Sequence, residues 1–273
     1  MSKNKISWCT ATWNPIVGCS KCSPGCKNCY AERMAKRLRG MSLPQYQDVV
    51  DKNGWTGKTM FSYGHLPKKP SLVFVSSMGD FFHESVSDQM LSNAFSVMCE
   101  NQQHTFILLT KRPERMLNYI NQHLRSLPNK LWCGVTVCNQ EEADKKIPVL
   151  LDVWSNVRLV SIEPMLGPVD LYRGGFGFLE QIKSPQGIQH EKLDWVICGG
   201  ESGPGARPIK PEWVRQIRDQ CVEAGVPFHF KQWGGHIPKS MEEKMSLYLA
   251  GYSLVDKNGG TILDGRRWKE FPE

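Results

Sequence analysis

The stretch Cys19-Ser-Lys-Cys22-Ser-Pro-Gly-Cys26-Lys-Asn-Cys29-Tyr30 places four cysteines within eleven residues near the start of the chain. Pro24 and Gly25 interrupt both helix and strand, so this segment is predicted to be a loop. A loop can direct several sulfurs toward one centre, and thiolates select zinc, copper(I) or iron–sulfur clusters. Two ligand triads are available: Cys22, Cys26 and Cys29 (C-x3-C-x2-C), or Cys19, Cys26 and Cys29 (C-x6-C-x2-C).

Three interpretations of these cysteines compete. A disulfide framework is disfavoured, because no signal peptide precedes the loop and a chain of 273 residues does not need covalent staples. A structural zinc site would use the two C-x2-C pairs, Cys19/Cys22 and Cys26/Cys29. Only three residues separate these pairs, whereas zinc modules usually have a spacer of roughly 15–20 residues. An iron–sulfur cluster is therefore the preferred interpretation.

The C-x3-C-x2-C pattern resembles the signature of radical S-adenosylmethionine (SAM) enzymes, in which three cysteines bind three irons of a [4Fe–4S] cluster and SAM binds the fourth. Over nearly its whole length, the chain more closely resembles the three-cysteine-motif family of phages and prophages. The segments that carry this resemblance are Thr12-Trp13-Asn14-Pro15 through Gly18-Cys19, Ser23-Pro24-Gly25-Cys26 and Cys29-Tyr30-Ala31-Glu32.

The resemblance implies that Cys19, Cys26 and Cys29 hold the cluster and that Tyr30 flanks the adenine of SAM. Position 22 is often not cysteine in that family, but this chain has Cys22 and therefore offers both triads. Cys26 and Cys29 belong to either triad, and the choice between Cys19 and Cys22 stays open.

The length and composition predict one domain with insertions. With 273 residues and 40% hydrophobic content, the chain can bury one core. A barrel-like domain is expected over residues 1–233, with insertions at about 41–70 and 171–192 and a C-terminal tail over 234–273. No apolar run reaches the ~18 residues of a membrane span, and the ten cysteines suit a reducing cytoplasm, that of a host cell if the chain is phage-encoded.

The chain carries a net charge of +7. A polyanionic partner such as nucleic acid would account for this charge, and so would an ordinary basic enzyme. A basic cluster of Arg33, Lys36, Arg37 and Arg39 lies on the helix predicted directly after the cysteine loop, which favours nucleic acid.

Short apolar runs alternate with helical patterns through most of the chain. Strands are predicted at 5–13, 72–76, 105–109, 131–137, 157–162, 195–198 and 227–231, and helices at 30–39, 88–100, 114–124, 141–153 and 211–224. This alternation is typical of a parallel sheet buried on both faces. A partial (β/α) barrel and an open doubly wound sheet both fit, and the resemblance to radical SAM enzymes favours an α/β partial barrel of that type.

Polar residues follow every predicted strand, at the edge where parallel α/β folds bind their ligands. They are Ser76, Ser77 and Asp80; Thr110, Lys111 and Arg112; Thr136, Cys138 and Asn139; Ser161 and Glu163; Gly199, Gly200 and Glu201; and Lys231, Gln232 and Trp233. Any one of them could simply cap the next helix. Their recurrence at each strand end favours a ligand site.

The resemblance assigns roles to several of these residues. Gly199-Gly200-Glu201 resembles the radical SAM element whose backbone binds the SAM amine, although it follows a late strand here, and Gly200 could equally serve a tight turn. The turn at 76–80 is better placed for the amine, which favours Ser77 and Asp80. Lys111 or Arg112 is then expected to bind the SAM carboxylate. Catalytic roles facing the substrate or ribose are expected for Glu163, Glu201 and Lys231.

The sequence thus predicts a radical SAM enzyme that receives electrons from an external donor such as flavodoxin or ferredoxin. The phage resemblance implies a modified base in DNA as substrate, for example an amino-acid-modified thymine isomerised from nitrogen to carbon linkage, with the base flipped out of a duplex. The competing hypothesis is a nucleic-acid-binding protein with a structural zinc or iron–sulfur site.

Overall fold

A computed structural model of the chain describes residues 6–123, 126–172, 177–180 and 191–273. The protein has a mixed α/β fold with a main sheet of seven strands in the order β1-β4-β5-β6-β7-β8-β9. The pairs β1–β4, β4–β5, β7–β8 and β8–β9 are parallel. The predicted α/β class and the parallel strands are confirmed. In the described part of the chain β1 and β9 are edge strands, as a partial barrel requires.

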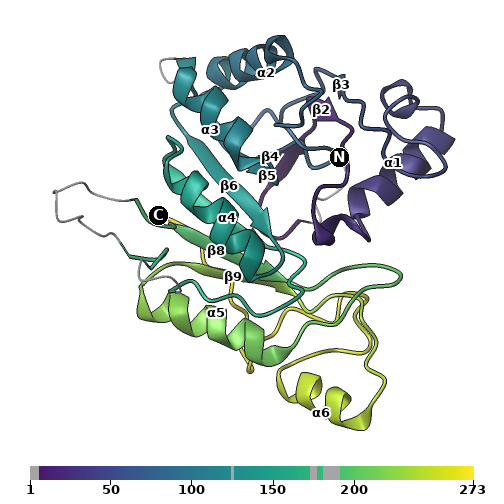
Figure 1. The fold of residues 1–273 in the computed structure, drawn as a ribbon, viewed down its shortest axis with the longest axis vertical. Coiled ribbons are helices and arrows are strands. Elements are labelled where there is room, and N and C mark those ends of the chain that lie inside the picture. Colours follow the sequence, from purple (N-terminus) through teal and green to yellow (C-terminus); the bar gives the residue numbers. More distant parts are fainter. Residues whose placement is uncertain (1–5, 124–125, 173–176, 181–190) are drawn as a thin grey trace. The chain divides into compact units, whose positions relative to one another are not determined.

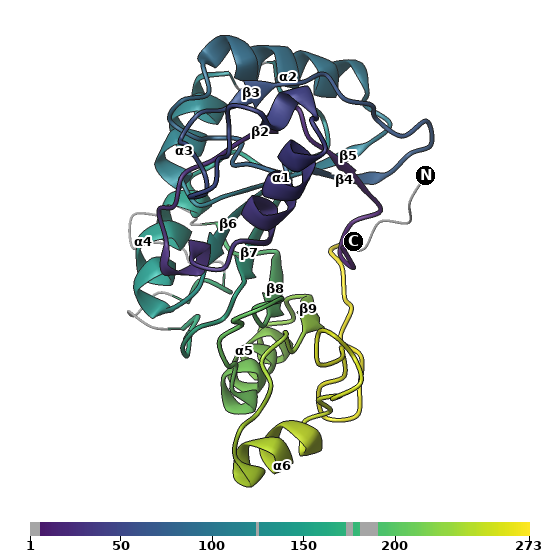
Figure 2. The same cartoon turned by 90° about the vertical axis from the view of Figure 1, so that its right-hand side faces the viewer.

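The chain forms two compact units, one of residues 1–134 with 153–156 and one of residues 135–152 with 157–273. In the first unit the parallel strands are β1 (Ala11–Trp13), β4 (Leu72–Val75) and β5 (Thr105–Thr110), with helices α2 (Asp88–Glu100) and α3 (Pro113–Gln122) beside them (Figure 1, Figure 2). The rings of Phe95 and Tyr119 stack between the two helices at 5.4 Å. Ser87 caps α2 by accepting from the Met90 amide, and Pro113 starts α3 at a position where proline is favoured.

Residues 41–70, predicted as an insertion, contribute to the core of the first unit. Tyr46, Val49 and Val50 are buried against Ala35 of helix α1 (Tyr30–Gly40). This segment contains a 3-10 turn, η2 (Pro44–Tyr46), and strand β3 (Met60–Phe61), which pairs antiparallel with β2 (Ile16–Val17). Cys29, at the end of the cysteine loop, packs against this same core cluster.

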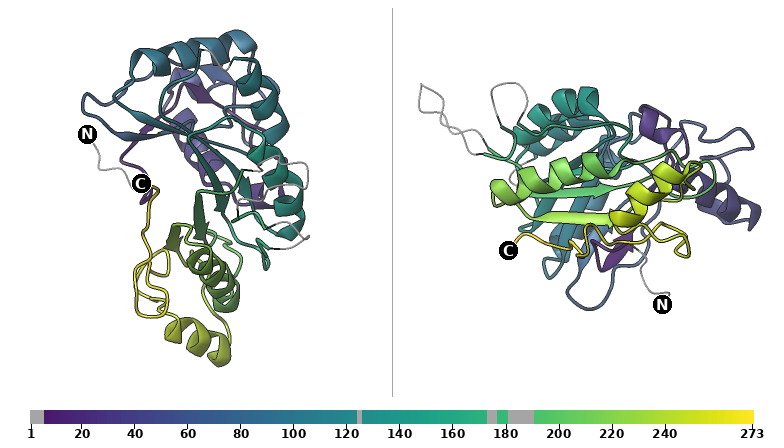
Figure 3. Two further views of the ribbon diagram at one scale, coloured as in Figure 1. Left: turned by 90° about the vertical axis from the view of Figure 1, so that its left-hand side faces the viewer. Right: turned by 90° about the horizontal axis from the view of Figure 1, so that it is seen from below.

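In the second unit the parallel strands are β7 (Val157–Ile162), β8 (Trp195–Gly199) and β9 (Phe228–Gln232). Helix α5 (Pro211–Glu223) lies along β8 and β9, and α6 (Met241–Leu249) is further out (Figure 3). Trp195, Phe228 and Phe230 are fully buried, so these strands are covered on both faces. Strand β6 (Leu131–Val137) and helix α4 (Gln140–Leu151) complete the named elements.

The predicted C-terminal tail belongs to the second unit and contains helix α6, which the sequence did not predict. The predicted insertion at 171–192 lies largely outside the described residues. Among the helices that the structure describes, each is too short or too polar to cross a bilayer.

Candidate functional site

The cysteine loop starts directly after β2, where two glycine backbones meet. Gly18 and Gly79 form a bridge, and a Cβ on Gly79 would lie 2.7 Å from the Gly18 carbonyl oxygen. Gly18 has φ of +98° and a Cβ there would lie 2.3 Å from the Lys58 oxygen, so only glycine fits. This close approach places Cys19 next to the turn that follows β4.

Cys22 and Cys26 are joined by a hydrogen bond between their side chains, across the 3-10 turn η1 (Pro24–Cys26). This hydrogen bond, helped by the Lys111 ammonium and by backbone amides, lowers the pKa of Cys26 to about 5. The same bond raises the pKa of Cys22, which keeps its proton and acts as the donor. The loop therefore holds a thiolate at neutral pH.

Cys19 has a different environment. Burial, together with the nearby Asp80 carboxylate, raises the pKa of Cys19 to about 12, and its thiol donates to the Ser20 carbonyl at 3.3 Å. The Arg112 guanidinium opposes this effect, with Nη1 at 3.9 Å from the Cys19 sulfur. Cys29, the residue before helix α1, is half-buried and lies within electrostatic reach of Cys19.

The carboxylate of Asp80, which the sequence predicts to bind SAM, is already hydrogen-bonded by other residues of the protein. Its carboxylate accepts hydrogen bonds from the Thr110 hydroxyl at 2.6 Å and from the amides of Phe82 and Lys111, each at 3.1 Å. It also pairs with Arg112 Nη1 at 2.9 Å, and both side chains are only 7% exposed. A carboxylate with these four donors is well suited to hold Arg112 in place.

Tyr30 and Ser77, both predicted to bind the cofactor, are brought together. The Tyr30 hydroxyl donates to the Ser77 carbonyl at 2.6 Å, and the Ser77 hydroxyl donates to Asn14 at 3.0 Å. The neighbouring Ser76 has φ of +59° and is 3% exposed, and its hydroxyl has no hydrogen-bond partner among the described residues. A strained residue with a buried, unsatisfied hydroxyl at a strand end is typical of a ligand site.

Lys111 follows β5, and its ammonium lies close enough to the cysteine loop to lower the pKa of Cys26. Its side chain is half-buried. Lys111 is thus a cation next to the Cys26 thiolate that is in a position to bind an anion, whereas the guanidinium of Arg112 is fully engaged by Asp80, Glu84 and Ser20.

Glu32 is a loop-anchoring residue that the sequence analysis missed. It is buried at the start of α1, where its carboxylate meets Lys21 of the cysteine loop at 3.2 Å, the Trp55 amide at 3.4 Å and Lys36 at 3.8 Å. Gly54, with φ of +134°, leaves room for this carboxylate. An acid in the first turn of a helix is a common cap, so its position alone gave no signal of this role.

In the second unit the structure joins Glu163 and Lys231, two of the predicted catalytic residues. Glu163 follows β7 and its Oε1 lies 2.9 Å from Lys231 Nζ on β9, while Ser161 donates to Oε2 at 3.0 Å. The backbone of Gly199 packs closely against Glu163, since a Cβ at this position would lie 2.9 Å from Glu163 Oε1. The side chains of Glu163 and Lys231 are 14% and 24% exposed, so the pair is accessible to a ligand.

Glu201 is separate from this pair in its contacts. Its carboxylate is buried and accepts from the Arg207 amide and Nε, both at 2.9 Å, as well as from Nη2. Gly200 is required by close packing, since a Cβ there would lie 1.8 Å from the Trp233 carbonyl oxygen. Close packing, rather than the predicted tight turn, thus explains the glycine at 200, and a catalytic role for Glu201 stays a prediction.

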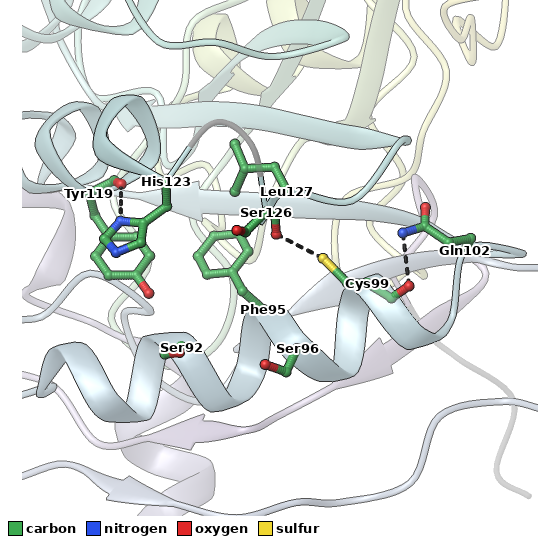
Figure 4. A pocket seen from close by; sticks show the side chains of 9 residues that line it. All are labelled: Ser92, Phe95, Ser96, Cys99, Gln102, Tyr119, His123, Ser126 and Leu127. Carbon is green, nitrogen blue, oxygen red and sulfur yellow. Dashed lines mark hydrogen bonds between the residues drawn. The ribbon is translucent and has the colours of Figure 1, made fainter.

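A cavity of about 470 Å³ opens elsewhere in the first unit, between α2 and α3 (Figure 4). Stacked rings of Tyr119 and His123, the ring of Phe95 and the serines of α2 line it. None of its lining residues is among the predicted site residues. In the described ranges, no three Cys, His, Asp or Glu side chains converge on a position for a single metal ion.

A family model described as a protein of unknown function (DUF5131) matches residues 3–272, which is nearly the entire chain. The chain belongs to this family. No curated protein and no solved structure matches it. The family establishes common ancestry along the whole chain, and the chemistry has to be inferred from the two strand-end groups described above.

Proposed function

We propose that the chain is a radical SAM enzyme whose [4Fe–4S] cluster is held by the cysteine loop. The observation that carries this proposal is the placement of four cysteines in one loop, beside the carboxyl ends of β1, β4 and β5. Carboxyl ends of parallel strands are where α/β folds bind ligands, and cysteine thiolates are the ligands of iron–sulfur clusters.

The residues of the loop fit such a cluster. Cys26 is already a thiolate because its pKa is lowered to about 5, so it binds iron without first losing a proton. In a cluster each cysteine binds a different iron, so the thiols do not have to meet at one point. The buried, unpartnered Ser76 hydroxyl and the Lys111 ammonium provide polar groups next to the loop for a bound ligand.

Cys26, Cys29 and Cys19 are proposed as the three ligands. Cys19 is half-buried beside Arg112, and the guanidinium of Arg112 also donates to the hydroxyl of the next residue, Ser20. Cys22, in contrast, is exposed and donates a hydrogen bond to Cys26. A cluster ligand benefits from a rigid, shielded position, which favours Cys19 over Cys22.

When bound, the cluster and SAM supply a 5′-deoxyadenosyl radical that abstracts hydrogen from the substrate. The protein would bind and orient SAM and the substrate. Lys111 is proposed to hold the SAM carboxylate and Tyr30, fixed through the Ser77 carbonyl, to flank the adenine. The electron comes from an external donor such as flavodoxin or ferredoxin, and Glu163 with Lys231 is proposed to bind or to exchange a proton with the substrate.

For the substrate we propose a base in phage DNA, namely a modified thymine. Arg33 and Arg37 are exposed on α1, four residues apart and therefore on one face of the helix that starts at the cluster loop. Such a pair can contact DNA phosphates. Lys36, expected to join them, is instead held by Glu32 and by the Lys52 carbonyl.

The test is anaerobic reconstitution with iron and sulfide, followed by reduction in the presence of SAM and detection of 5′-deoxyadenosine. The proposal predicts iron, sulfide and a broad visible absorbance in the wild type, with 5′-deoxyadenosine formed, and neither in Cys29→Ala. A colourless protein that binds zinc and cleaves no SAM would instead support a nucleic-acid-binding protein with a structural metal site.

A further inference from the structure

Arg112 occupies the centre of a buried charged network. Its Nε pairs with Glu84 at 2.7 Å, its Nη1 with Asp80 at 2.9 Å, and its Nη2 with the Ser20 hydroxyl at 2.9 Å. The guanidinium also donates from Nη2 to the Ser20 carbonyl at 3.4 Å, and its Nη1 lies 3.9 Å from Cys19 Sγ. Ser20 and Cys19 belong to the cysteine loop, so a single side chain from the start of α3 reaches two consecutive residues of that loop.

The geometry of the guanidinium is firmly fixed. Asp80 is itself held by the Thr110 hydroxyl and two backbone amides, and the Asp80–Arg112 pair is shielded from water. A planar guanidinium with partners on each arm has little freedom, and a buried charge with these partners cannot move without losing them. His83 adds a second anchor, because its Nε2 lies 2.8 Å from the Ser20 hydroxyl.

We propose that Arg112 is a positioning residue that holds Cys19 at the cluster and donates a hydrogen bond to its sulfur. This inference rests on the proposed iron–sulfur function. A charged N–H donor directed at a ligating thiolate withdraws electron density from the sulfur, which favours the reduced cluster and raises its reduction potential. Arg112 would thereby tune how readily an external donor reduces the cluster, in addition to placing the ligand.

The first measurement is the reduction potential of the reconstituted cluster, from an electron paramagnetic resonance titration, together with iron content. Arg112→Gln is expected to lower the potential and the iron content, and Arg112→Lys to restore the potential in part because it keeps the charge. Arg215→Gln is the matched control: Arg215 pairs with Asp264 at 2.8 Å in the second unit, so its loss removes a guanidinium and an ion pair without changing the partners of Arg112, and the potential should stay unchanged. A wild-type potential and full iron in Arg112→Gln would overturn the proposal.

The second measurement needs no metal. In the cluster-free protein, backbone hydrogen exchange of the peptide that carries Cys19 and Ser20 is followed by mass spectrometry, with helix α5 of the second unit as the internal reference. Arg112→Gln should increase exchange of this peptide severalfold relative to α5, and Ser20→Ala should do so to a smaller extent. Unchanged exchange in both variants would overturn the positioning role. If the wild type bound no cluster, the proposed function would fail while this exchange experiment still decided whether Arg112 positions the residues around Cys19.

Discussion

Cys26 of the first unit and the buried cysteines of the second unit have pKa values shifted in opposite directions. In the loop of the first unit, a hydrogen bond from Cys22 lowers the pKa of Cys26 to about 5. In the second unit, burial raises the pKa of Cys198 and Cys221 well above the ordinary value for a thiol. Cys198 lies in β8, and its sulfur is 3.6 Å from the sulfur of Met165. Position in the fold thus separates the Cys26 thiolate from core thiols that keep their protons.

The acidic residues that follow the strands also have different environments in the two units. In the first unit the buried acid, Asp80, is held by the chain and supports a cysteine loop. In the second unit Glu163 and Lys231 form a partly exposed ion pair, and the Ser161 hydroxyl donates to Glu163. The first group is thus closed by its own buried ion pair, whereas Glu163 and Lys231 of the second group stay partly exposed.

The largest expected effect tests whether metal binding is confined to the first unit. Cys26→Ala and Cys29→Ala should abolish bound iron and all SAM cleavage, and Cys19→Ala should do the same, because a cluster with two protein ligands is not retained. Cys22→Ala and the core variant Cys221→Ala should keep both. Iron and 5′-deoxyadenosine are measured after reconstitution, and loss of iron in Cys22→Ala alone would exchange the roles of Cys19 and Cys22.

A second prediction concerns the acid sensitivity of the second unit. Burial, with Lys269 and Lys231 nearby, lowers the pKa of His229 to about 4 from 6.5. Below pH 6.5 His229 becomes protonated in the unfolded chain but stays neutral in the folded chain. The free energy of unfolding therefore decreases progressively as the pH falls from 6.5 to 4. The loss reaches about 3 kcal/mol in the free energy of unfolding.

The measurement is chemical denaturation at pH 7 and pH 4. His229→Phe should reduce the loss between these two pH values, whereas His65→Gln, at an exposed position, should not. An identical pH dependence in His229→Phe and the wild type would show that other groups cause the acid sensitivity.

The third prediction contrasts two lysines, one from each unit. Lys111→Ala should weaken SAM binding about ten- to a hundredfold with iron content intact, because losing a charge-assisted hydrogen bond costs roughly 1.5–3 kcal/mol. Lys231→Ala should leave SAM affinity and iron unchanged. Equilibrium dialysis of the reconstituted protein with SAM measures both. An equal loss of SAM affinity in the two variants would contradict the proposal that only the first unit binds SAM.

The smallest expected effect concerns DNA. If Arg33 and Arg37 contact phosphates, binding should weaken with salt, and the Arg33/Arg37→Gln double variant should reduce the salt slope by roughly 1.8, a difference of about tenfold between 50 and 200 mM salt. Lys239/Lys244→Gln, two exposed cations near or on α6 of the second unit, is the control and should keep the wild-type slope. An unchanged slope in the Arg33/Arg37 variant would show that α1 does not bind DNA.

The secondary structure was largely predictable because strong local signals agree with the fold. β6 and β7 match the predicted ranges in full, and α2 does so with Ser87 as its cap. Helix α6 was missed, since Met241, Met245 and Tyr248 are exposed and a helix pattern without a buried face is weak. The role of residues 41–70 was also missed, because glycines and prolines in a segment indicate loops and do not reveal that Tyr46 and Val50 pack in the core.

The sequence by itself determined the inventory of the site: four cysteines in a loop, and a polar residue at the end of each strand. Only the tertiary structure decided how these residues pair. Asp80 and Arg112 are 32 residues apart, and Glu163 and Lys231 are 68 apart, yet each pair forms an ion pair of 2.9 Å. Composition and spacing report local propensity, whereas the partner of a buried charge depends on which strands become neighbours in the sheet.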